Sequence, residues 1–509
     1  MRRHTRSARL VRMAVALGCL VSTPPCLADD DGLRRQVETL VEQNAELKRE
    51  LDALRSEVSE VRDEALAARD SADRQAREAR EAATRSPVSE AAAETDAEGA
   101  IFSRQVGRAN FQLLDLSLDT LFAAGFSSAN DDELEVLQGG GHDPRQRGFT
   151  LQQVELSLLG AVDPYMTGEA HLVYFLDTEG ESQFEIEEAF LTTQMLPLHL
   201  EEMGVQVQAG AFFTEFGRIN PQHPHAWDWQ DQPVILSRLF GEDGMRGPGV
   251  RLSWLTPLPW YSELHFGMQN AKGETMVSFL ANDEVFEERP IAGRPFADTR
   301  VTGLGDFVYL TRWVNGFDVS DSVSAQVGAS ALFGPNATGS DGSTIIAGGD
   351  LVVKWRPLQT DRGWPFVTWQ TEFLYRDYRA DDFFGCVDGE EECDAPVFVD
   401  GSDVDDYGLY TQLLWGFRRG WAAGVRYEYA SGSGQDFDAE GLDFVSHNRD
   451  GFRDTRHRVS PLLVFQPSEF SRLRLQYNYD HVQHLSDESV HSAWAGVEFM
   501  FGAHSAHSY

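Results

Sequence analysis

Apolar and polar residues alternate with a period of two along most of the chain, from about residue 110 to residue 501. The pattern is plainest in residues 472–480, where Leu473, Leu475 and Tyr477 occupy every second position between arginine, glutamine and asparagine. Strict alternation predicts β-strands with one apolar and one polar face. A soluble β-sandwich would show the same alternation as a membrane barrel, so the pattern alone leaves both folds open.

The connections between the candidate strands separate these two folds. Short turns, such as Asp163-Pro164, Asn315-Gly316 and 418–420, interleave with connections that are mostly longer. Short turns on one rim and long loops on the other are typical of outer-membrane barrels, whose short side faces the periplasm. We therefore predict an all-β transmembrane barrel of about 16 antiparallel strands over residues 110–501, with both ends periplasmic and a C-terminal tail at 502–509. The predicted strands are 111–126, 148–162, 167–176, 184–193, 205–216, 248–255, 260–269, 305–314, 322–334, 343–356, 366–378, 407–417, 421–429, 455–465, 471–480 and 491–501.

A seven-residue repeat of apolar residues precedes the predicted barrel. From Leu33 onward, two positions of the heptad are apolar over six repeats, with a polar interruption at Asn44. Such a long apolar stripe needs a partner helix, which predicts an α-helical coiled coil within residues 29–85, with a solvated single helix as the alternative. The seam residues favour two helices, but a three-fold barrel downstream could impose three. Residues 86–109 begin with an aperiodic stretch rich in alanine, glutamate and serine, which indicates a linker.

The first residues have the form of an export signal. Five arginines precede an apolar stretch at 13–21. This stretch is too short to span a bilayer, so we predict a signal peptide at residues 1–28, cleaved after Ala28. The exported chain then retains Cys386 and Cys393, which predicts a disulfide in an oxidising compartment, with two free thiols as the alternative.

Composition restricts the partners and the chemistry. The chain has 81 acidic residues and 43 lysines and arginines, which gives a formal net charge of -38. This charge repels polyanions and argues against nucleic-acid binding. Mean hydropathy is -0.35, and no run of about 18 apolar residues occurs beyond the first thirty positions, which excludes transmembrane helices. The sequence has no catalytic Ser/His/Asp motif, phosphate-binding loop or Cys/His cluster with zinc-finger spacing, so we predict that the protein is not an enzyme.

Two stretches of the sequence resemble known outer-membrane proteins. Residues 216–227 (FGRINPQHPHAW) and 469–479 (EFSRLRLQYNY) are similar to porin-like barrels labelled zinc-regulated or TonB-dependent outer-membrane receptors. The predicted signal peptide, coiled coil and barrel together resemble the Gram-negative outer-membrane porin superfamily, in particular trimeric porins with an N-terminal periplasmic coiled coil. The resemblance implies a homo-trimer in the outer membrane that contacts lipid and lipopolysaccharide, conducts small polar solutes and has peptidoglycan as a further candidate partner.

In general porins the third long loop folds into the lumen, and the resemblance suggests the same for residues 217–247. Acidic residues of this loop would then face arginines on the inner faces of late strands, and the resulting transverse field suits small polar solutes. Equally, these charges could form buried ion pairs that brace a folded-in loop. The predicted constriction comprises Trp227, Asp228, Asp231, Glu242 and Asp243 from the loop and Arg426, Arg456, Arg458, Arg472 and Arg474 from the strands.

The same loop contains a candidate metal site. His223 and His225 can present two imidazoles to Zn²⁺, with Asp228 or Asp231 completing the shell, although both histidines could simply be polar lining without any cofactor. The acidic stretch around the two cysteines is a candidate Ca²⁺ site or a solvated run of charge. The alternative functions are therefore a zinc-linked uptake or receptor barrel and a structural tether between the outer membrane and the cell wall.

Overall fold

The computed structural model describes residues 102–106, 109–386, 396–439, 441–445, 450–483, 485 and 487–502, with side chains from residue 114 onward except at 287–288. The predicted signal peptide and coiled coil lie outside the described residues. So do most of the predicted linker and all but the first residue of the predicted C-terminal tail.

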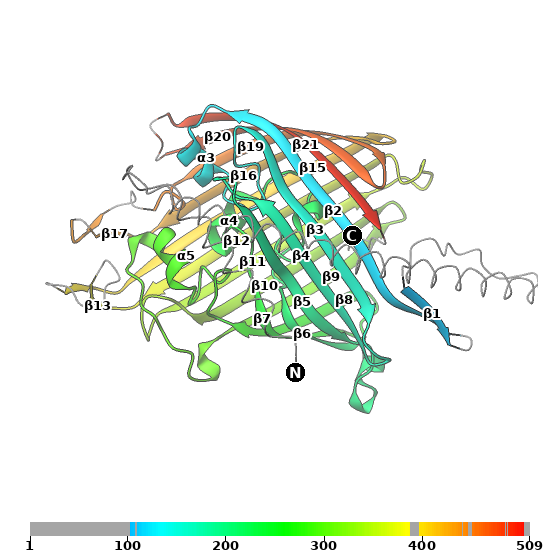
Figure 1. Cartoon of the computed structure of the whole chain (residues 1–509), viewed down its shortest axis with the longest axis horizontal. Coiled ribbons are helices and arrows are strands. Elements are labelled where there is room, and N and C mark those ends of the chain that lie inside the picture. The colour runs from blue at the N-terminus through cyan, green and yellow to red at the C-terminus, as the bar shows by residue number, and fades with distance from the viewer. Residues whose placement is uncertain are drawn as a thin grey trace, which may run out of the picture. The chain divides into compact units, whose positions relative to one another are not determined.

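Sixteen antiparallel strands form a closed barrel, which confirms the predicted strand number (Figure 1). Consecutive strands are hydrogen-bonded, and the last strand pairs with the first, from Ser117 opposite Gly502 to Ser127 opposite Ser492. Within the predicted linker, the short strand β1 (Phe102–Val106) pairs with the start of β2. The barrel strands are β2 (Ala109–Ser127), β3 (Gly148–Ala161), β4 (Met166–Leu176), β5 (Ser182–Thr193), β6 (Val205–Phe213), β7 (Arg246–Leu255), β8 (Tyr261–Asn270), β9 (Phe307–Ser320), β10 (Val323–Pro335), β11 (Ser343–Trp355), β12 (Phe366–Ala380), β15 (Ser402–Arg418), β16 (Trp421–Ser433), β19 (Arg456–Ser468), β20 (Ser471–Val482) and β21 (Ser489–Gly502).

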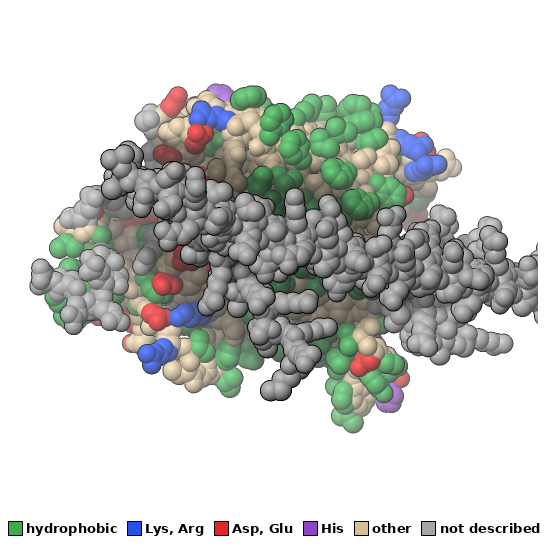
Figure 2. Space-filling model, in the orientation of Figure 1, with side chains coloured by type: hydrophobic (Ala, Val, Ile, Leu, Met, Phe, Trp, Pro, Cys, Tyr) green, Lys and Arg blue, Asp and Glu red, His purple; other side chains and the backbone are tan. Residues whose placement is uncertain are grey.

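Burial alternates along the strands as the sequence pattern predicts. In β20, Leu473, Leu475 and Tyr477 are 42%, 58% and 40% exposed, whereas Arg474 and Gln476 are only 2% and 3% exposed. In this strand, apolar side chains therefore face outward and polar side chains face the inside of the barrel. This is the arrangement expected of a barrel in a lipid bilayer. Hydrophobic side chains are spread over the visible outer wall in Figure 2.

Most of the short and long connections lie on opposite rims of the barrel. The short rim has turns at 162–165, 256–260, 321–322, 419–420 and 469–470, and a longer connection with η1 (Pro197–Met203). The chain reaches β2 and leaves β21 on this rim, because the number of barrel strands is even. The long-rim connections contain α3 (Asp131–Leu137), α5 (Asp283–Glu288), η3 (Ile291–Gly293), η4 (Leu304–Asp306) and the hairpins β13 (Phe383–Gly385) with β14 (Val397–Val399) and β17 (Asp436–Asp438) with β18 (Asp443–Val445).

The turn predicted at Asn315-Gly316 is wrong, and the one predicted at 466–468 lies at 469–470 instead, because β19 continues to Ser468. Asn315 and Gly316 lie inside β9, and the chain turns at residues 321–322 instead. The outward apolar positions continue beyond Gly316, since Phe317 is 43% exposed on the lipid-facing side. A Cβ atom on Gly316 would lie 3.1 Å from Cδ1 of Tyr261, its partner on β8. The missing side chain here accommodates an aromatic neighbour and does not mark a turn.

The long-rim connection between β6 and β7 enters the barrel. Residues 214–245, here called the inserted segment, contain η2 (Pro224–Ala226) and α4 (Val234–Phe240), and every residue of α4 is buried. Figure 1 shows α4 surrounded by the barrel strands. Its apolar side chains share a core with inward residues of the wall, among them Leu374 and Tyr410. Within the described residues, every helix is too short or too polar to cross a membrane.

Candidate functional site

The barrel wall has glycines where bulky side chains of the inserted segment approach it. Trp229 is 1% exposed, and its indole Nε1 donates to the carbonyl oxygen of Ser460 over 2.9 Å. A Cβ atom on Gly424 would lie 2.9 Å from the Trp229 ring, and one on Gly348 would lie 2.8 Å from the Phe216 ring. Both contacts are closer than a side chain tolerates without displacement. The wall is therefore shaped to receive this segment.

Asp231 joins the inserted segment to the wall through charge. Its buried carboxylate accepts hydrogen bonds from Arg426, from Arg458 at 2.9 Å, and from Gln476 and Asn478 at 2.7 Å each. Burial alone would raise the pKa of Asp231, but the two guanidinium groups outweigh it and lower this pKa to about 2. Among the predicted constriction residues, these three are brought together as buried ion pairs. This is the alternative that the sequence left open.

Two further predicted arginines bind the backbone of the inserted segment. Arg472 donates to the carbonyl oxygen of His225 at 2.6 Å. Arg474 donates to the carbonyl oxygens of Trp227 and Trp229 at 3.1 Å and 3.2 Å. A single carboxylate on β21 pairs with both guanidinium groups. These contacts hold the path of the main chain and depend little on which side chains it carries.

Three other predicted constriction residues have partners other than Asp231. Arg456 pairs with a carboxylate on β20 and donates to the carbonyl oxygen of Leu137, the last residue of α3. Glu242 pairs with Arg145 at 2.7 Å, and Asp243 lies 3.9 Å from a histidine nitrogen of the connection after β2. Both acids come where the chain returns toward the long rim, so they face the neighbouring connection and not the arginine wall.

A cavity of about 1020 Å³ lies on the short-rim side of the inserted segment. Its lining includes Arg362 and Phe470 from short-rim connections, and Trp227 and Asp228 from the inserted segment. Burial raises the pKa of Asp228, against the lowering effect of Arg472. Of the four acidic residues in the predicted constriction, Asp228 is the one that lines this cavity.

Among the charged residues that line the cavity, three acidic residues lie across the lumen from two basic ones. Glu155, Glu169 and Glu188 come from β3, β4 and β5, whereas Lys354 and Arg356 come from the end of β11 and the connection after it. In the closed order of sixteen strands, β11 is seven strands from β4 and therefore lies across the lumen. The arginines of the basic wall predicted on later strands contact the inserted segment instead, although Arg472 also lines the cavity.

His223 and His225 face carboxylates of the barrel wall and not the two aspartates predicted from the sequence. His223 lies between Glu187 and Glu188, with ring nitrogens 2.8 Å and 2.9 Å from their oxygens. His225 has its Nδ1 atom 2.8 Å from Glu155. Glu155, Glu187 and Glu188 therefore take the place of the two predicted aspartates beside these histidines, because η2 turns both rings toward the inner faces of β3 and β5. Metal binding by His223 and His225 stays a prediction.

The electrostatics of these two histidines follow from the same carboxylates. Burial opposes protonation of His223, but Glu155 and Glu187 outweigh it and raise its pKa well above the ordinary value. Glu155 likewise raises the pKa of His225 against the effect of burial. The pocket thus favours positive charge at these positions. Glu155 was not predicted as a site residue because polar inward positions recur on every strand. The three glutamates within residues 185–188 were a signal only for Glu187 and Glu188.

The predicted disulfide lies at the edge of the described residues. Cys386 is disulfide-bonded, whereas Cys393 and most of the candidate calcium-binding stretch lie outside the described residues. The pairing of these two cysteines stays a prediction.

No protein-family model matches the chain. It is 28% identical over 423 residues to an uncharacterized protein of Aquifex aeolicus (strain VF5), covering 78% of this chain and 80% of that protein. Among solved structures it is similar to the outer membrane channel DcaP of Acinetobacter baumannii, with 11% identity, 76% and 97% coverage and a TM-score of 0.45. It is also similar to the anion-selective porin from Comamonas acidovorans, with 9% identity, 76% and 99% coverage and a TM-score of 0.44.

Proposed function

We propose that this protein is a porin-like channel of the outer membrane through which small polar solutes diffuse. The observation that carries the proposal is a closed barrel with an apolar exterior that encloses a polar cavity of about 1020 Å³ at its short rim. An apolar exterior suits lipid, and a charged interior wall is costly unless water or polar solutes occupy the space beside it.

In this proposal the inserted segment narrows the lumen, and the charges that face solutes differ from those that anchor it. Asp231 with Arg426 and Arg458 forms the anchor, since all three are buried and paired. Lys354 and Arg356 border the open cavity across from the acidic wall of β3 to β5. Charges that border the solute path set ion preference, because low-dielectric walls focus their field.

The decisive test is conductance in a planar bilayer, with reversal potentials in a KCl gradient. The wild-type chain should form channels, and the Lys354→Gln/Arg356→Gln double variant should shift preference toward cations because it removes two positive charges from one wall. The matched control is Lys272→Gln/Arg379→Gln, in which the same two residue types are removed from exposed long-rim positions. A folded, heat-modifiable barrel that never conducts would refute the channel and leave the structural tether.

We further propose that residues 29–85 form a periplasmic coiled coil that joins barrels into a homo-oligomer, with a trimer as the favoured state. The heptad repeat supports this proposal, since its apolar stripe needs partner helices. The start of β2 and the end of β21 lie on the short rim, which agrees with a periplasmic coiled coil because short turns are periplasmic in outer-membrane barrels.

A further inference from the structure

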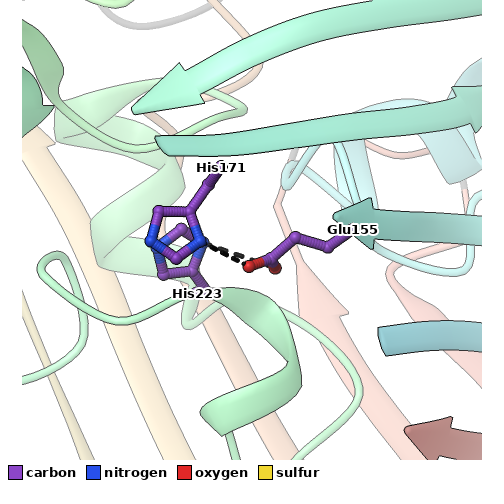
Figure 3. Close-up of side chains that lie close together, drawn as sticks. All are labelled: Glu155, His171 and His223. Atoms are coloured by element: carbon purple, nitrogen blue, oxygen red, sulfur yellow. Dashed lines mark hydrogen bonds and ion pairs between the residues drawn. The ribbon is translucent and has the colours of Figure 1, made fainter. Parts of the chain in front are cut away.

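Three histidine rings converge on one carboxylate at the edge of the cavity. His171 Nδ1 lies 2.8 Å from Oε1 of Glu155, His225 Nδ1 lies 2.8 Å from Oε2, and His223 Nδ1 lies 3.5 Å from Oε2. Figure 3 shows His171 and His223 beside Glu155, with the three side chains reaching one point from β4, the inserted segment and β3. Ligand atoms of these three residues all lie within 4.8 Å of one another.

The far nitrogen of two of these rings is held by a second carboxylate. His171 Nε2 lies 3.1 Å from Glu169, and His223 Nε2 lies 2.9 Å from Glu188. A ring whose Nε2–H donates to a carboxylate can direct its Nδ1 lone pair at a cation. Nδ1 of His223 also lies 2.8 Å from Glu187, so an ion bound there would have the Glu187 carboxylate beside it as well. Carboxylate-backed histidines of this kind are characteristic of metal sites, in which the outer carboxylate fixes the tautomer and raises ligand basicity.

A separate observation is a buried carboxylate beside the cluster that makes no hydrogen bond among the described residues. Asp119 on β2 is only 4% exposed, and neither of its carboxylate oxygens has a hydrogen-bond partner among the described residues. It lies directly opposite Glu155 in the β2–β3 register, so both side chains are on the inner face of adjacent strands. A buried carboxylate without a hydrogen bond is costly, and a cation shared with Glu155 would remove that cost.

We propose that Glu155, His171 and His223 bind a divalent transition-metal ion of the Zn²⁺ class, with His225 and Asp119 adjacent as further donors. Imidazole and carboxylate ligands together suit Zn²⁺ and its neighbours better than Ca²⁺ or Mg²⁺, which prefer all-oxygen sites. Neighbouring ligand atoms around tetrahedral Zn²⁺ are roughly 3.3 Å apart, given bonds of about 2.0–2.1 Å. The Glu155 contacts at 2.8 Å and 3.5 Å lie on either side of that value.

Such an ion would join two barrel strands to the inserted segment. Glu155 belongs to β3, His171 to β4, and His223 lies just before η2. The bound metal would therefore add a cross-link between wall and segment at the border of the cavity. The site goes beyond the proposed channel, since a barrel can bind metal whether or not it conducts.

The test is equilibrium dialysis of the full chain in detergent against Zn²⁺ after treatment with a chelator. We expect one tightly bound Zn²⁺ per chain, and at least a hundredfold weaker binding in Glu155→Gln and in His223→Ala. The control is His265→Ala, which should bind as the wild type does. His265 is a buried histidine on β8 that lies outside the cluster. It shares a hydrogen bond of 2.9 Å with the Ser253 hydroxyl.

Wild-type protein that binds no more Zn²⁺ than the Glu155→Gln variant would overturn the proposal, as would an equal loss in His265→Ala. The cluster would then be a network of imidazolium–carboxylate ion pairs. Because a variant can fail to fold, Co²⁺ spectra of the wild type provide a second measurement. Intense visible bands of a four- or five-coordinate site are expected, and the weak spectrum of hydrated Co²⁺ refutes the site. Conductance without zinc binding overturns only this proposal and leaves the channel intact.

Discussion

Asp231→Asn is the most informative single substitution in the lumen, because it removes charge without changing shape at the contact that anchors the inserted segment. The carboxylate accepts from two guanidinium groups and two side-chain amides, all in the buried interior. The variant leaves Arg426 with Glu428 at 2.7 Å and Arg458 with Asp480 at 2.9 Å. Neither arginine therefore becomes an isolated buried charge, although each loses half of its carboxylate contacts.

The expected cost can be worked out from the pKa of Asp231. A decrease from the ordinary 3.8 to about 2 corresponds to roughly 2 kcal/mol in favour of the ionised group. This expected cost is smaller than the roughly 3–5 kcal/mol that breaking a fully buried ion pair costs. The difference is expected because each arginine keeps a second carboxylate partner. Because the pKa is lowered, the contribution is present above about pH 4 and is lost as pH falls toward 2, so it should be constant from roughly pH 5 to 9.

A loss of about 2 kcal/mol lowers the ratio of docked to undocked segment about 30-fold. Single-channel recording should show this as an increase of similar size in the occupancy of a higher-conductance state. Asp228→Asn is the matched control, since it makes the same substitution on the same segment at a position that borders the cavity. It should change ion preference while leaving that occupancy unchanged. Equal occupancies in Asp231→Asn and wild type would refute the anchoring role.

Three further outcomes are expected. Gly424→Val should displace Trp229, since even a Cβ would lie 2.9 Å from the ring, and should lower the temperature of the heat-modifiability transition while increasing mean conductance. An unchanged transition would contradict the tight fit. A cysteine at Ser340 should react with a membrane-impermeant maleimide on intact cells, and one at Asp321 should not; the reverse accessibility would overturn the topology. Deleting residues 29–85 should weaken or abolish the detergent-stable oligomer and leave a heat-modifiable barrel, whereas an unchanged oligomer would show that barrel contacts suffice.

The barrel was predictable because lipid on one side and polar groups on the other force every strand into the same alternation. In β20 this placed Leu473 and Arg474 on the correct faces without knowledge of any neighbour. Gly316 misled the turn assignment, because a glycine that accommodates the Tyr261 ring is indistinguishable in sequence from one that ends a strand. The alternation says which face a residue occupies, but it does not give the position where a strand stops.

The candidate site was only partly predictable. Asp231 and the arginines could be grouped by charge, since acids in a folded-in loop and bases on late strands were expected to meet. The pairing of Glu242 with Arg145 depends on how two separate connections fold, which no periodicity encodes. Glu155 and His171 lie at ordinary inward positions of early strands. Their meeting with His223 follows from the path of the inserted segment through the barrel.

The hydrogen bonds from Arg472 and Arg474 to carbonyl oxygens have a consequence for sequence change and for engineering. Every residue type supplies a carbonyl oxygen, so the side chains of Ala226 and Asp228 can be exchanged while these three hydrogen bonds persist. New chemistry could therefore be installed at the border of the cavity without redesigning the barrel that carries it. The two arginines of the wall bind the backbone of the inserted segment whatever side chains it carries. The residue at position 228, which borders the cavity, can therefore differ between channels for different solutes.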